Sequence, residues 1–404
     1  MRIVLISFLL ISSTAMAGWV QKADFGGVAR HRTTTLNIGN KIYMGLGHYN
    51  GAGPNILFND WWEYDPATNA WTQKANYGGG ICYHAAGFTI NDIGYVGTGR
   101  ITPSGNTLVQ DFYKYNPTTN SWTQITSLPG LPRRGAVGFE LGGYGYLGTG
   151  EINSGSGRTG TFYRFDPGNE TWLQIASLPV ARTSSVAFSI DSYGYVGTGN
   201  TDWGSANDFW RYDPGTNTWT QLPNVGPTNR QEAMGFSIDG RGYIGTGDDY
   251  SSGNNFADMW EFDPGTNAWT QLPDFPGTAR RYLGAIHFGS VAFAGLGTNG
   301  TNFKDFWMFG RLLSSEQLEA IDQLELLAYP NPSAEYVSFD WGEMTNDQMA
   351  HLEIEIIDMN GKVLTQEEAS KDMIIDTRLW ERGTYIYRLK YQTNYFKTGK
   401  LIKH

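Results

Sequence analysis

Most of the chain consists of short stretches in which large apolar residues alternate with small or polar ones. A period of two is typical of β-strands, whose side chains point to opposite faces in turn. The stretches are separated by Gly, Pro, Asn and Asp, residues that favour tight turns. In one example, two such stretches flank Asp191 and Ser192 between Val186 and Thr198. The pattern therefore predicts an all-β protein.

The alternating pattern repeats with a period of about fifty residues. Each repeat contains a Gly-x-Gly triplet, and successive triplets begin 48 to 52 residues apart. The six triplets begin at Gly45, Gly97, Gly148, Gly197, Gly245 and Gly295. The first five are followed by a Tyr-Asp-Pro-like turn and then by Trp-x-Gln or a close variant of it. A period near fifty built from short strands predicts a β-propeller, with one four-stranded blade per repeat.

The sixth repeat lacks the fourth strand of a blade. After Phe306–Phe309 the chain shows neither the Asp-Pro turn nor Trp-x-Gln. The missing motif stands near the other end of the chain, as Trp19-Val20-Gln21. We therefore expect this N-terminal segment to complete the last blade and to close the ring, which removes exposed sheet edges.

The first strand of each expected blade has one bulky and one small position next to each other. The large residues are Leu36, Phe88, Phe139, Phe188, Phe236 and Ile286, and the small ones are Thr35, Gly87, Gly138, Ala187, Gly235 and Ala285. Because neighbouring side chains on a strand face opposite ways, we expect the bulky face of one blade to pack on the small face of the next.

These repeats resemble the Kelch motif over residues 18–310, with Gly-Thr-Gly in place of the diglycine usual in that family. The Tyr-Asp-Pro turn and the tryptophan after it also match. The resemblance implies a six-bladed Kelch-type β-propeller closed by an N-terminal strand. It does not imply one activity, because Kelch propellers include enzymes, adhesins and scaffolds.

The first seventeen residues have the pattern of a secretory signal peptide. Arg2 precedes an apolar run from Ile3 to Ile11, and Ala15-Met16-Ala17 predicts cleavage after Ala17. The apolar run of about nine residues is too short to span a bilayer, and no other stretch is long enough. We therefore expect an exported chain without a transmembrane span.

Composition changes near residue 325, where glycine and tryptophan become rare and charged residues more frequent. The change predicts a linker over residues 311–325, with a short helix from Ser314 to Gln323, and a separate domain over residues 326–404. Alternation at Leu352–Ile356 and the turn residues Asp358–Gly361 favour a small β-sandwich.

The motifs of the C-terminal domain resemble the type A sorting domain of type IX secretion, found in Bacteroidetes. The matching motifs are Tyr329-Pro330-Asn331-Pro332, Asp358-Met359-Asn360-Gly361-Lys362, Gly383-Thr384-Tyr385 and Gly399–Lys403. The resemblance implies contact with the secretion machinery and passage through the outer membrane, after which the domain is removed or used for surface attachment. A plain ligand-binding sandwich is the alternative.

Charge and cysteine content exclude several classes of function. The net charge of −10 argues against a nucleic-acid partner, which would need a concentrated basic surface. A single cysteine excludes an intrachain disulfide and a Cys-rich zinc site. Neither calcium-binding loops nor phosphate-binding loops are evident, and we expect no metal or cofactor.

Candidate ligand-binding residues lie at the crossings between blades, on the face with the long loops. An arginine precedes the Gly-x-Gly triplet by fifteen positions in five repeats, and Cys82 takes its place in the other. Two residues further on, the residue type differs from blade to blade. The candidate set is Arg30, Arg32, His84, Arg133, Arg182, Arg230, Glu232, Arg280 and Tyr282.

We hypothesise that this channel mouth binds an acidic or polyhydroxylated sugar, because guanidinium groups suit carboxylates. In the alternative interpretation the repeated arginines only tie adjacent blades together through backbone carbonyls, as arginine commonly does in Kelch repeats. The favoured function is a secreted or cell-surface protein that binds a glycan or an extracellular protein through its long-loop face.

A sugar-processing enzyme, such as one resembling the sialic-acid epimerases and mutarotases, is the alternative function. Six-bladed Kelch sugar epimerases use Arg, Glu and His near the channel, and that resemblance implies roles for Arg30, Glu232 and His84. A Kelch-like copper oxidase fits poorly, because its Cys–Tyr crosslink and histidine ligands are not matched by the consecutive Cys82-Tyr83-His84, even with His31 and His48 nearby. His287 is interpreted as a polar spacer.

Overall fold

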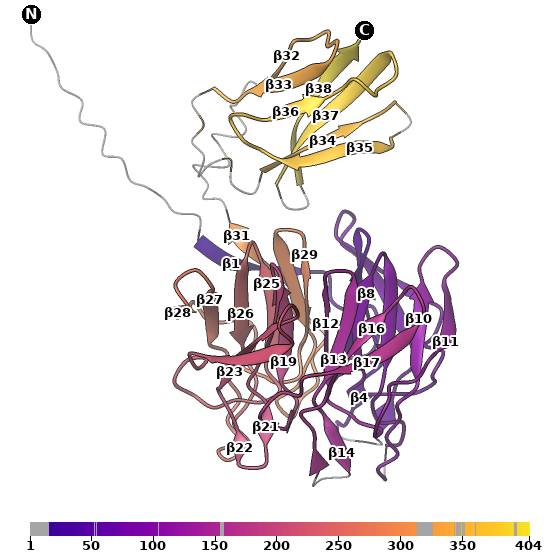
Figure 1. The fold of residues 1–404 in the computed structure, drawn as a ribbon, viewed down its shortest axis with the longest axis vertical. Helices are drawn as coiled ribbons and strands as arrows, with labels where there is room; N and C mark the ends of the chain where they lie inside the picture. Colours follow the sequence, from indigo (N-terminus) through magenta and orange to yellow (C-terminus); the bar gives the residue numbers. More distant parts are fainter. Residues whose placement is uncertain are drawn as a thin grey trace, which may run out of the picture. The chain divides into compact units, whose positions relative to one another are not determined.

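The computed structural model describes residues 16–312 and 326–404, apart from residues 52, 54, 104, 154–156, 343, 345–348, 350–351, 360 and 392–393. Most of the expected signal peptide and the expected linker helix lie outside the described residues. The chain divides into two compact units, Trp19–Phe309 and a second one that includes Gly310–His404. The elements assigned in both units are β-strands, as expected for an all-β protein (Figure 1).

The first unit contains six four-stranded antiparallel sheets, counted over the described residues. The strands of the first three blades are β2 (Thr34–Ile38), β3 (Lys41–Gly45), β6 (Trp61–Asp65) and β7 (Ala70–Lys74); β8 (Ala86–Ile90), β9 (Ile93–Gly97), β10 (Phe112–Asn116) and β11 (Ser121–Ile125); and β12 (Val137–Leu141), β13 (Tyr144–Gly148), β16 (Phe162–Asp166) and β17 (Thr171–Ile175).

The next two blades contain β19 (Val186–Ile190), β20 (Tyr193–Gly197), β23 (Phe209–Asp213) and β24 (Thr218–Leu222); and β25 (Met234–Ile238), β26 (Arg241–Gly245), β27 (Met259–Asp263) and β28 (Ala268–Leu272). The sixth contains β29 (Gly284–Phe288), β30 (Val291–Gly295), β31 (Phe306–Leu312) and β1 (Met16–Lys22). This arrangement confirms the six-bladed propeller. The first strands of successive blades contact one another in chain order, and β29 of the last blade contacts β2 of the first.

The N-terminal strand closes the ring as expected. Strand β1 is the outermost strand of the sixth blade, in the order β1-β31-β30-β29. The ring of Trp19 packs on aromatic residues of the fifth and sixth blades, with centroids 5.1 Å from Phe275 and 4.9 Å from Phe309. The start and the end of the propeller are therefore held in one sheet, which needs no disulfide.

The packing between blades differs in one respect from the expectation. In four of the six blades, the bulky residue of the first strand does pack on the next blade, but against a glycine of its second strand. A Cβ added to Gly242 would lie 2.7 Å from the ring of Phe188, so only glycine fits there. The small residues of the first strands, such as Gly138 and Ala187, instead line the axial channel. The reason is the narrow axis, where six strands converge and large side chains would collide.

Short hairpins extend the loops of several blades. They are β4 (His48–Tyr49) with β5 (Ile56–Leu57), β14 (Glu151–Asn153) with β15 (Gly157–Arg158), and β18 (Arg182–Thr183) with β21 (Asn200–Thr201) and β22 (Gly204–Ser205). Strands β4, β14, β21 and β22 lie toward the same end of the propeller (Figure 1). This end carries the long loops and the channel mouth.

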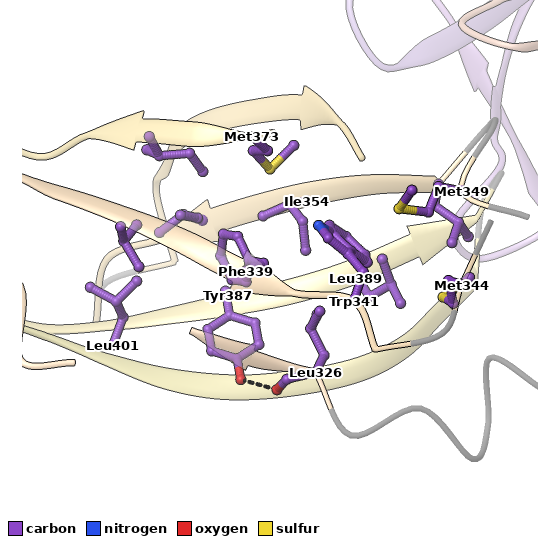
Figure 2. Packing of buried hydrophobic residues seen from close by; sticks show 14 of the residues in the cluster. Leu326, Phe339, Trp341, Met344, Met349, Ile354, Met373, Tyr387, Leu389 and Leu401 are labelled. Carbon is purple, nitrogen blue, oxygen red and sulfur yellow. Dashed lines mark hydrogen bonds between the residues drawn. The ribbon is translucent and has the colours of Figure 1, made fainter. Parts of the chain in front are cut away.

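The second unit is a small β-sandwich, as expected. One sheet contains β32 (Leu327–Tyr329), β33 (Tyr336–Asp340) and β36 (Ile374–Asp376), and the other contains β34 (Leu352–Ile357), β35 (Val363–Glu368), β37 (Gly383–Tyr391) and β38 (Asn394–Lys403). Phe339, Ile354 and Leu389 fill its core (Figure 2). The hydroxyl of buried Tyr387 donates to the carbonyl of Leu326 at 2.7 Å. Across the described residues, no helix has the length and apolar character to cross a bilayer.

Candidate functional site

The five repeated arginines do not reach the channel mouth. Their side chains are at most 1% exposed. In the fourth blade, Arg182 donates to both carboxylate oxygens of Asp208, at 2.8 and 2.5 Å, and to the carbonyl of Thr198 at 2.8 Å. The equivalent ion pairs are Arg30–Asp60, Arg230–Asp258 and Arg280–Asp305, while Arg133 donates to the carbonyl of Thr149 and the hydroxyl of Thr161.

The structure therefore places these five predicted site residues inside the fold, where each guanidinium already has hydrogen-bond partners. Their backbone carbonyls also join the blades. The carbonyl of Arg182 accepts from Gly150 of the preceding blade at 2.7 Å, and that of Arg230 accepts from Gly199 at 2.9 Å. The last glycine of five Gly-x-Gly triplets thus binds the arginine of the next crossing, and Gly47 binds Cys82 in the same way.

Cys82 takes the place of the arginine in the second blade. It is buried, and its Sγ donates to the carbonyl of Thr98 at 3.4 Å. Burial raises the pKa of its thiol to about 12, so the thiol stays protonated at neutral pH. A buried protonated thiol does not supply the donor that the copper-oxidase alternative requires.

Six residues form a ring around the channel mouth. Each of them stands two residues after one of the five buried arginines or after Cys82. They are Arg32, His84, Gly135, Ser184, Glu232 and Tyr282, and all have φ between 54° and 61°. Their backbones are linked in sequence, since the N–H groups of His84, Gly135, Ser184, Glu232 and Tyr282 each donate to the carbonyl of the preceding ring member at 2.8 to 3.2 Å. We call these six residues the mouth ring.

The left-handed backbone of the mouth ring favours glycine, yet only Gly135 has that residue. A non-glycine residue in this conformation costs on the order of 1 kcal/mol. The centres of the Gly-x-Gly triplets share the conformation, but there the residue is always Thr or a buried Leu that packs the fold. In the mouth ring the five side chains are all different, so the symmetric fold alone does not account for them.

The mouth ring forms the floor of a pocket of about 420 Å³. Arg32, His84, Ser184, Glu232 and Tyr282 all line it. The structure thus brings together four of the nine predicted site residues, Arg32, His84, Glu232 and Tyr282. The remaining five are the buried arginines.

Arg32 differs from four of the five buried arginines because no described carboxylate forms an ion pair with it. It differs from Arg133, which has no ion-paired carboxylate either, because it lines the pocket. It donates to His31 Nε2 at 3.0 Å and to the hydroxyl of Tyr282, and its guanidinium lies 3.9 Å from the centre of the Tyr282 ring. Its Nε is buried and has no hydrogen-bond partner. Burial lowers the pKa of Arg32, but the group remains a cation at neutral pH. Arg32 is therefore a fixed cation that can still accept an anionic partner.

His31 holds Arg32 in place. Its Nδ1 lies 2.6 Å from the side-chain oxygen of Asn302, and its Nε2 accepts from Arg32. These partners fix the neutral tautomer with the proton on Nδ1. Burial, together with the charge of Arg32, lowers the pKa of His31 to about 3, so the orientation persists at neutral pH.

The environment of Glu232 in the mouth ring differs from that of Arg32. Its side chain is 9% exposed, and one carboxylate oxygen lies 3.3 Å from Nε of Arg281. Burial raises the pKa of Glu232 to about 8, with a smaller opposing effect from Arg32. Glu232 therefore carries a proton over much of the neutral range. Burial also lowers the pKa of His84 well below its usual value, so His84 is neutral.

Two ion pairs form further walls of the pocket. Arg134 donates through Nη2 to both oxygens of Glu151 at 3.0 and 2.9 Å. Arg158 donates to Asp202 at 2.9 Å and to the side-chain oxygen of Asn200 at 2.8 Å. These charged groups surround Arg32 and Glu232 with polar side chains that can accept or donate to hydroxyl groups.

Sequence reasoning missed these wall residues. The missed pocket residues include Arg134, Glu151, Arg158, Asn200, Asp202, Gln231 and Tyr250. A signal was available, because the residue just before each ring member pairs with the residue just after a Gly-x-Gly triplet, as in Arg134 with Glu151 and Gln231 with Asp248. Both positions vary from blade to blade, as the ring itself does.

The described residues contain no group of three or more His, Cys, Asp or Glu placed to hold a metal ion. The opposite end of the channel holds a second cavity of about 450 Å³, where His287 lies among the polar residues Asn37, Thr89, Glu140 and Ser189. His287 lies 3.2 Å from the side-chain nitrogen of Asn37.

These features define a β-propeller of the Kelch type with a polar pocket at one mouth of its channel. Comparison with family models agrees: residues 132–282 match the KLHDC2/KLHL20/DRC7 Kelch-repeats domain, and residues 327–404 match the secretion system C-terminal sorting domain. The chain therefore contains a Kelch-repeat domain followed by a type IX secretion C-terminal sorting domain.

Two individual proteins are similar to parts of the chain. N-acetylneuraminate epimerase of Shigella sonnei (strain Ss046) is 32% identical over 116 residues, which cover 28% of this chain and 29% of the epimerase. The chain thus matches less than a third of the length of that relative. A solved structure of YjhT superposes with a TM-score of 0.60 over 71% of this chain and 96% of its own, at 16% identity, which shows the shared fold alone.

Proposed function

We propose that this protein is a secreted or surface-attached Kelch-repeat protein that binds an acidic sugar in the pocket above the mouth ring. The observation that carries the proposal is Arg32, a half-buried guanidinium in the pocket lining with no ion-paired carboxylate among the described residues and with a buried, unpartnered Nε. A buried charge normally has a partner. A ligand carboxylate would supply that partner, through the planar fork that guanidinium presents.

The rest of the pocket suits the hydroxyl groups of a sugar. Ser184, Asn200, Asp202 and Gln231 line it with donors and acceptors, and its volume of about 420 Å³ accommodates a single sugar ring. The sorting domain points to export, and it supports a location outside the cell or on its surface. The epimerase relative supports N-acetylneuraminate as the first acidic sugar to test.

Isothermal titration with N-acetylneuraminate tests the proposal. We expect the wild-type protein to bind it and to bind the neutral sugar N-acetylmannosamine far more weakly. Arg32→Gln removes the positive charge that would bind the carboxylate of the sugar. A charge-assisted hydrogen bond contributes about 1.5–3 kcal/mol, so we expect the variant to bind roughly 10- to 100-fold more weakly.

The matched control is Arg241→Gln, which removes the same charge from a partly exposed arginine that pairs with Asp263 on strand β27. It should leave the affinity unchanged. Equal affinity of Arg32→Gln and wild type for N-acetylneuraminate, with both proteins folded, would contradict the proposal.

A second candidate function is the interconversion of sugar anomers or epimers. The favouring observation is the pairing of a protonated acid with a neutral base around one pocket, since burial raises the pKa of Glu232 to about 8 and lowers that of His84. Opening a sugar ring at its anomeric centre needs one group to donate a proton and another to accept one near neutral pH. Glu232 would donate the proton, and neutral His84 would be the acceptor, a weak base because burial lowers its pKa.

Proton NMR of freshly dissolved N-acetylneuraminate separates this candidate from passive binding. An enzyme would speed the equilibration of anomers beyond the spontaneous rate, and Glu232→Gln would slow that catalysed rate at least 100-fold. If the wild type binds the sugar without changing the spontaneous rate, the protein is a binding protein only.

A further inference from the structure

Trp203 differs from all other tryptophans of the chain. The fourteen tryptophans all lie among the described residues, and Trp203, at 86% exposed, is the only one that is not at least partly buried. Nine tryptophans of the repeats donate from Nε1 to a fixed partner, as Trp210 does to Asp208 at 2.6 Å and Trp219 does to the carbonyl of Ala176 at 2.9 Å. Trp203 therefore has no evident role in holding the blades together.

A rigid hairpin presents Trp203. It stands at the turn between β21 and β22, where the hydroxyl of buried Thr201 donates to the carbonyl of Gly204 at 3.0 Å and accepts from the N–H of Trp203 at 3.1 Å. The side chain of Asp202 is held by Arg158 at 2.9 Å. The tip is thus fixed before any ligand arrives, which lowers the entropic cost of binding there.

The hairpin lies at the rim of the pocket, beside a second exposed aromatic residue. Asp202 and Gly204, the neighbours of Trp203, both line the pocket, and so does Tyr250. Tyr250 is 72% exposed, and its N–H donates to the hydroxyl of Ser205 on β22 at 3.1 Å. Two large aromatic side chains therefore stand on linked loops at one edge of the polar pocket.

We propose that Trp203 and Tyr250 form an outer subsite for the second sugar ring of a glycan whose acidic end residue occupies the pocket. The proposal rests on the proposed function and narrows its ligand class from free acidic sugars to glycans that end in one. In this proposal Trp203 and Tyr250 determine whether the protein prefers a glycan to a single sugar.

The chemistry of a glycan fits this arrangement. One face of a pyranose ring consists mainly of C–H groups, which lose little hydration when they cover an aromatic ring, while its hydroxyl groups at the edge remain in water. Large exposed aromatic surface next to a polar pocket is otherwise unfavourable and marks interaction sites. The pocket itself holds one ring, so the linked sugar has to leave it across the rim.

Titration with two probes tests the proposal: N-acetylneuraminate, which fills the pocket alone, and sialyllactose, in which the same sugar is linked to a neutral disaccharide. We expect the wild type to bind sialyllactose about 10-fold more tightly. Trp203→Ala should remove that advantage and leave the affinity for N-acetylneuraminate within about twofold. Tyr250→Ala should have a smaller effect in the same direction.

Leu173→Ala is the control, because Leu173 is also exposed, at 55%, but lies on the outer strand β17. It should change neither affinity. If Trp203→Ala binds both probes as the wild type does, or weakens both equally, the outer subsite is overturned while the acidic-sugar pocket stands. If the wild type binds neither probe, the proposed function fails and this inference fails with it.

Discussion

Two groups of residues occupy neighbouring positions in every blade, yet they have opposite roles. The buried arginines keep the same residue type in five blades, and four of them pair with an aspartate at the start of the third strand. The mouth ring, two residues further along, keeps the same backbone but has a different residue in each blade. The buried arginines stabilise the fold. The mouth ring has non-glycine residues at five positions whose left-handed backbone favours glycine.

The comparison shows how repeated and varying residues differ in meaning in a symmetric protein. A symmetric scaffold gives equivalent positions equivalent environments, so a structural requirement selects the same residue each time. A single ligand that sits across the axis is not symmetric and needs a different group from each blade. Arg30 and Arg32 therefore have different roles, although they are the same residue type at the same crossing.

The largest expected effect comes from breaking the buried group. Arg182→Leu leaves the partly buried carboxylate of Asp208 without its ion pair, and removal of one partner of such a pair costs about 3–5 kcal/mol. We expect the melting temperature to fall by about 10 °C. Thermal unfolding followed by circular dichroism measures the change.

The matched variant is Arg32→Gln, which should shift the stability by less than about 1 kcal/mol, because no carboxylate loses a partner. An equal loss of stability in both variants would show that the two groups are not distinct.

A smaller effect is expected from Glu232, and it depends on pH. Burial raises the pKa of Glu232 from 4.5 to about 8 in the folded state, so its contribution to stability is fully present below pH 4.5 and is lost as the pH rises through 8. Glu232→Gln removes this loss. We expect the variant to match the wild type at pH 4.5 and to be more stable than the wild type at pH 9.

Urea unfolding at the two pH values measures the difference. A stability difference of the same size at both pH values would mean that folding does not raise the pKa of Glu232, contrary to the interpretation of the pocket.

The smallest expected effect comes from the strained backbone of the mouth ring. Ser184 has φ of 54°, whereas the equivalent residue in the preceding blade is Gly135. Ser184→Gly relieves the left-handed strain and should stabilise the protein by up to about 1 kcal/mol. Ser184→Ala keeps the strain and should not stabilise it. A loss of stability in the glycine variant would contradict the view that the non-glycine residues of the mouth ring lower the free energy of unfolding.

Sequence reasoning predicted much of the fold, because its determinants are local. The Gly-x-Gly triplets, the turn residues and the Trp-x-Gln strands indicate each blade within about fifty residues. Closure by Trp19 was also predictable, since the sixth repeat lacks one strand and only one unused copy of the motif exists. The same local signals do not show which side chains point toward the axis.

The candidate site was predicted only in part. The buried arginines were assigned to the mouth because their carboxylate partners lie 25 to 30 residues further along the chain, in another strand. Arg134, Glu151 and Arg158 were missed because they reach the pocket through loops that fold back over the mouth. Trp203 lies outside the repeated motifs of the blade tryptophans, but the sequence does not show that its side chain is exposed at the rim of the pocket.

A crystal structure of the protein with N-acetylneuraminate tests the central claim most directly. We predict that the sugar lies in the long-loop pocket, with its carboxylate on the guanidinium of Arg32 and with Arg182 and the other buried arginines still paired inside the blades. A sugar bound at the opposite channel end around His287, or a carboxylate held by one of the buried arginines, would contradict it.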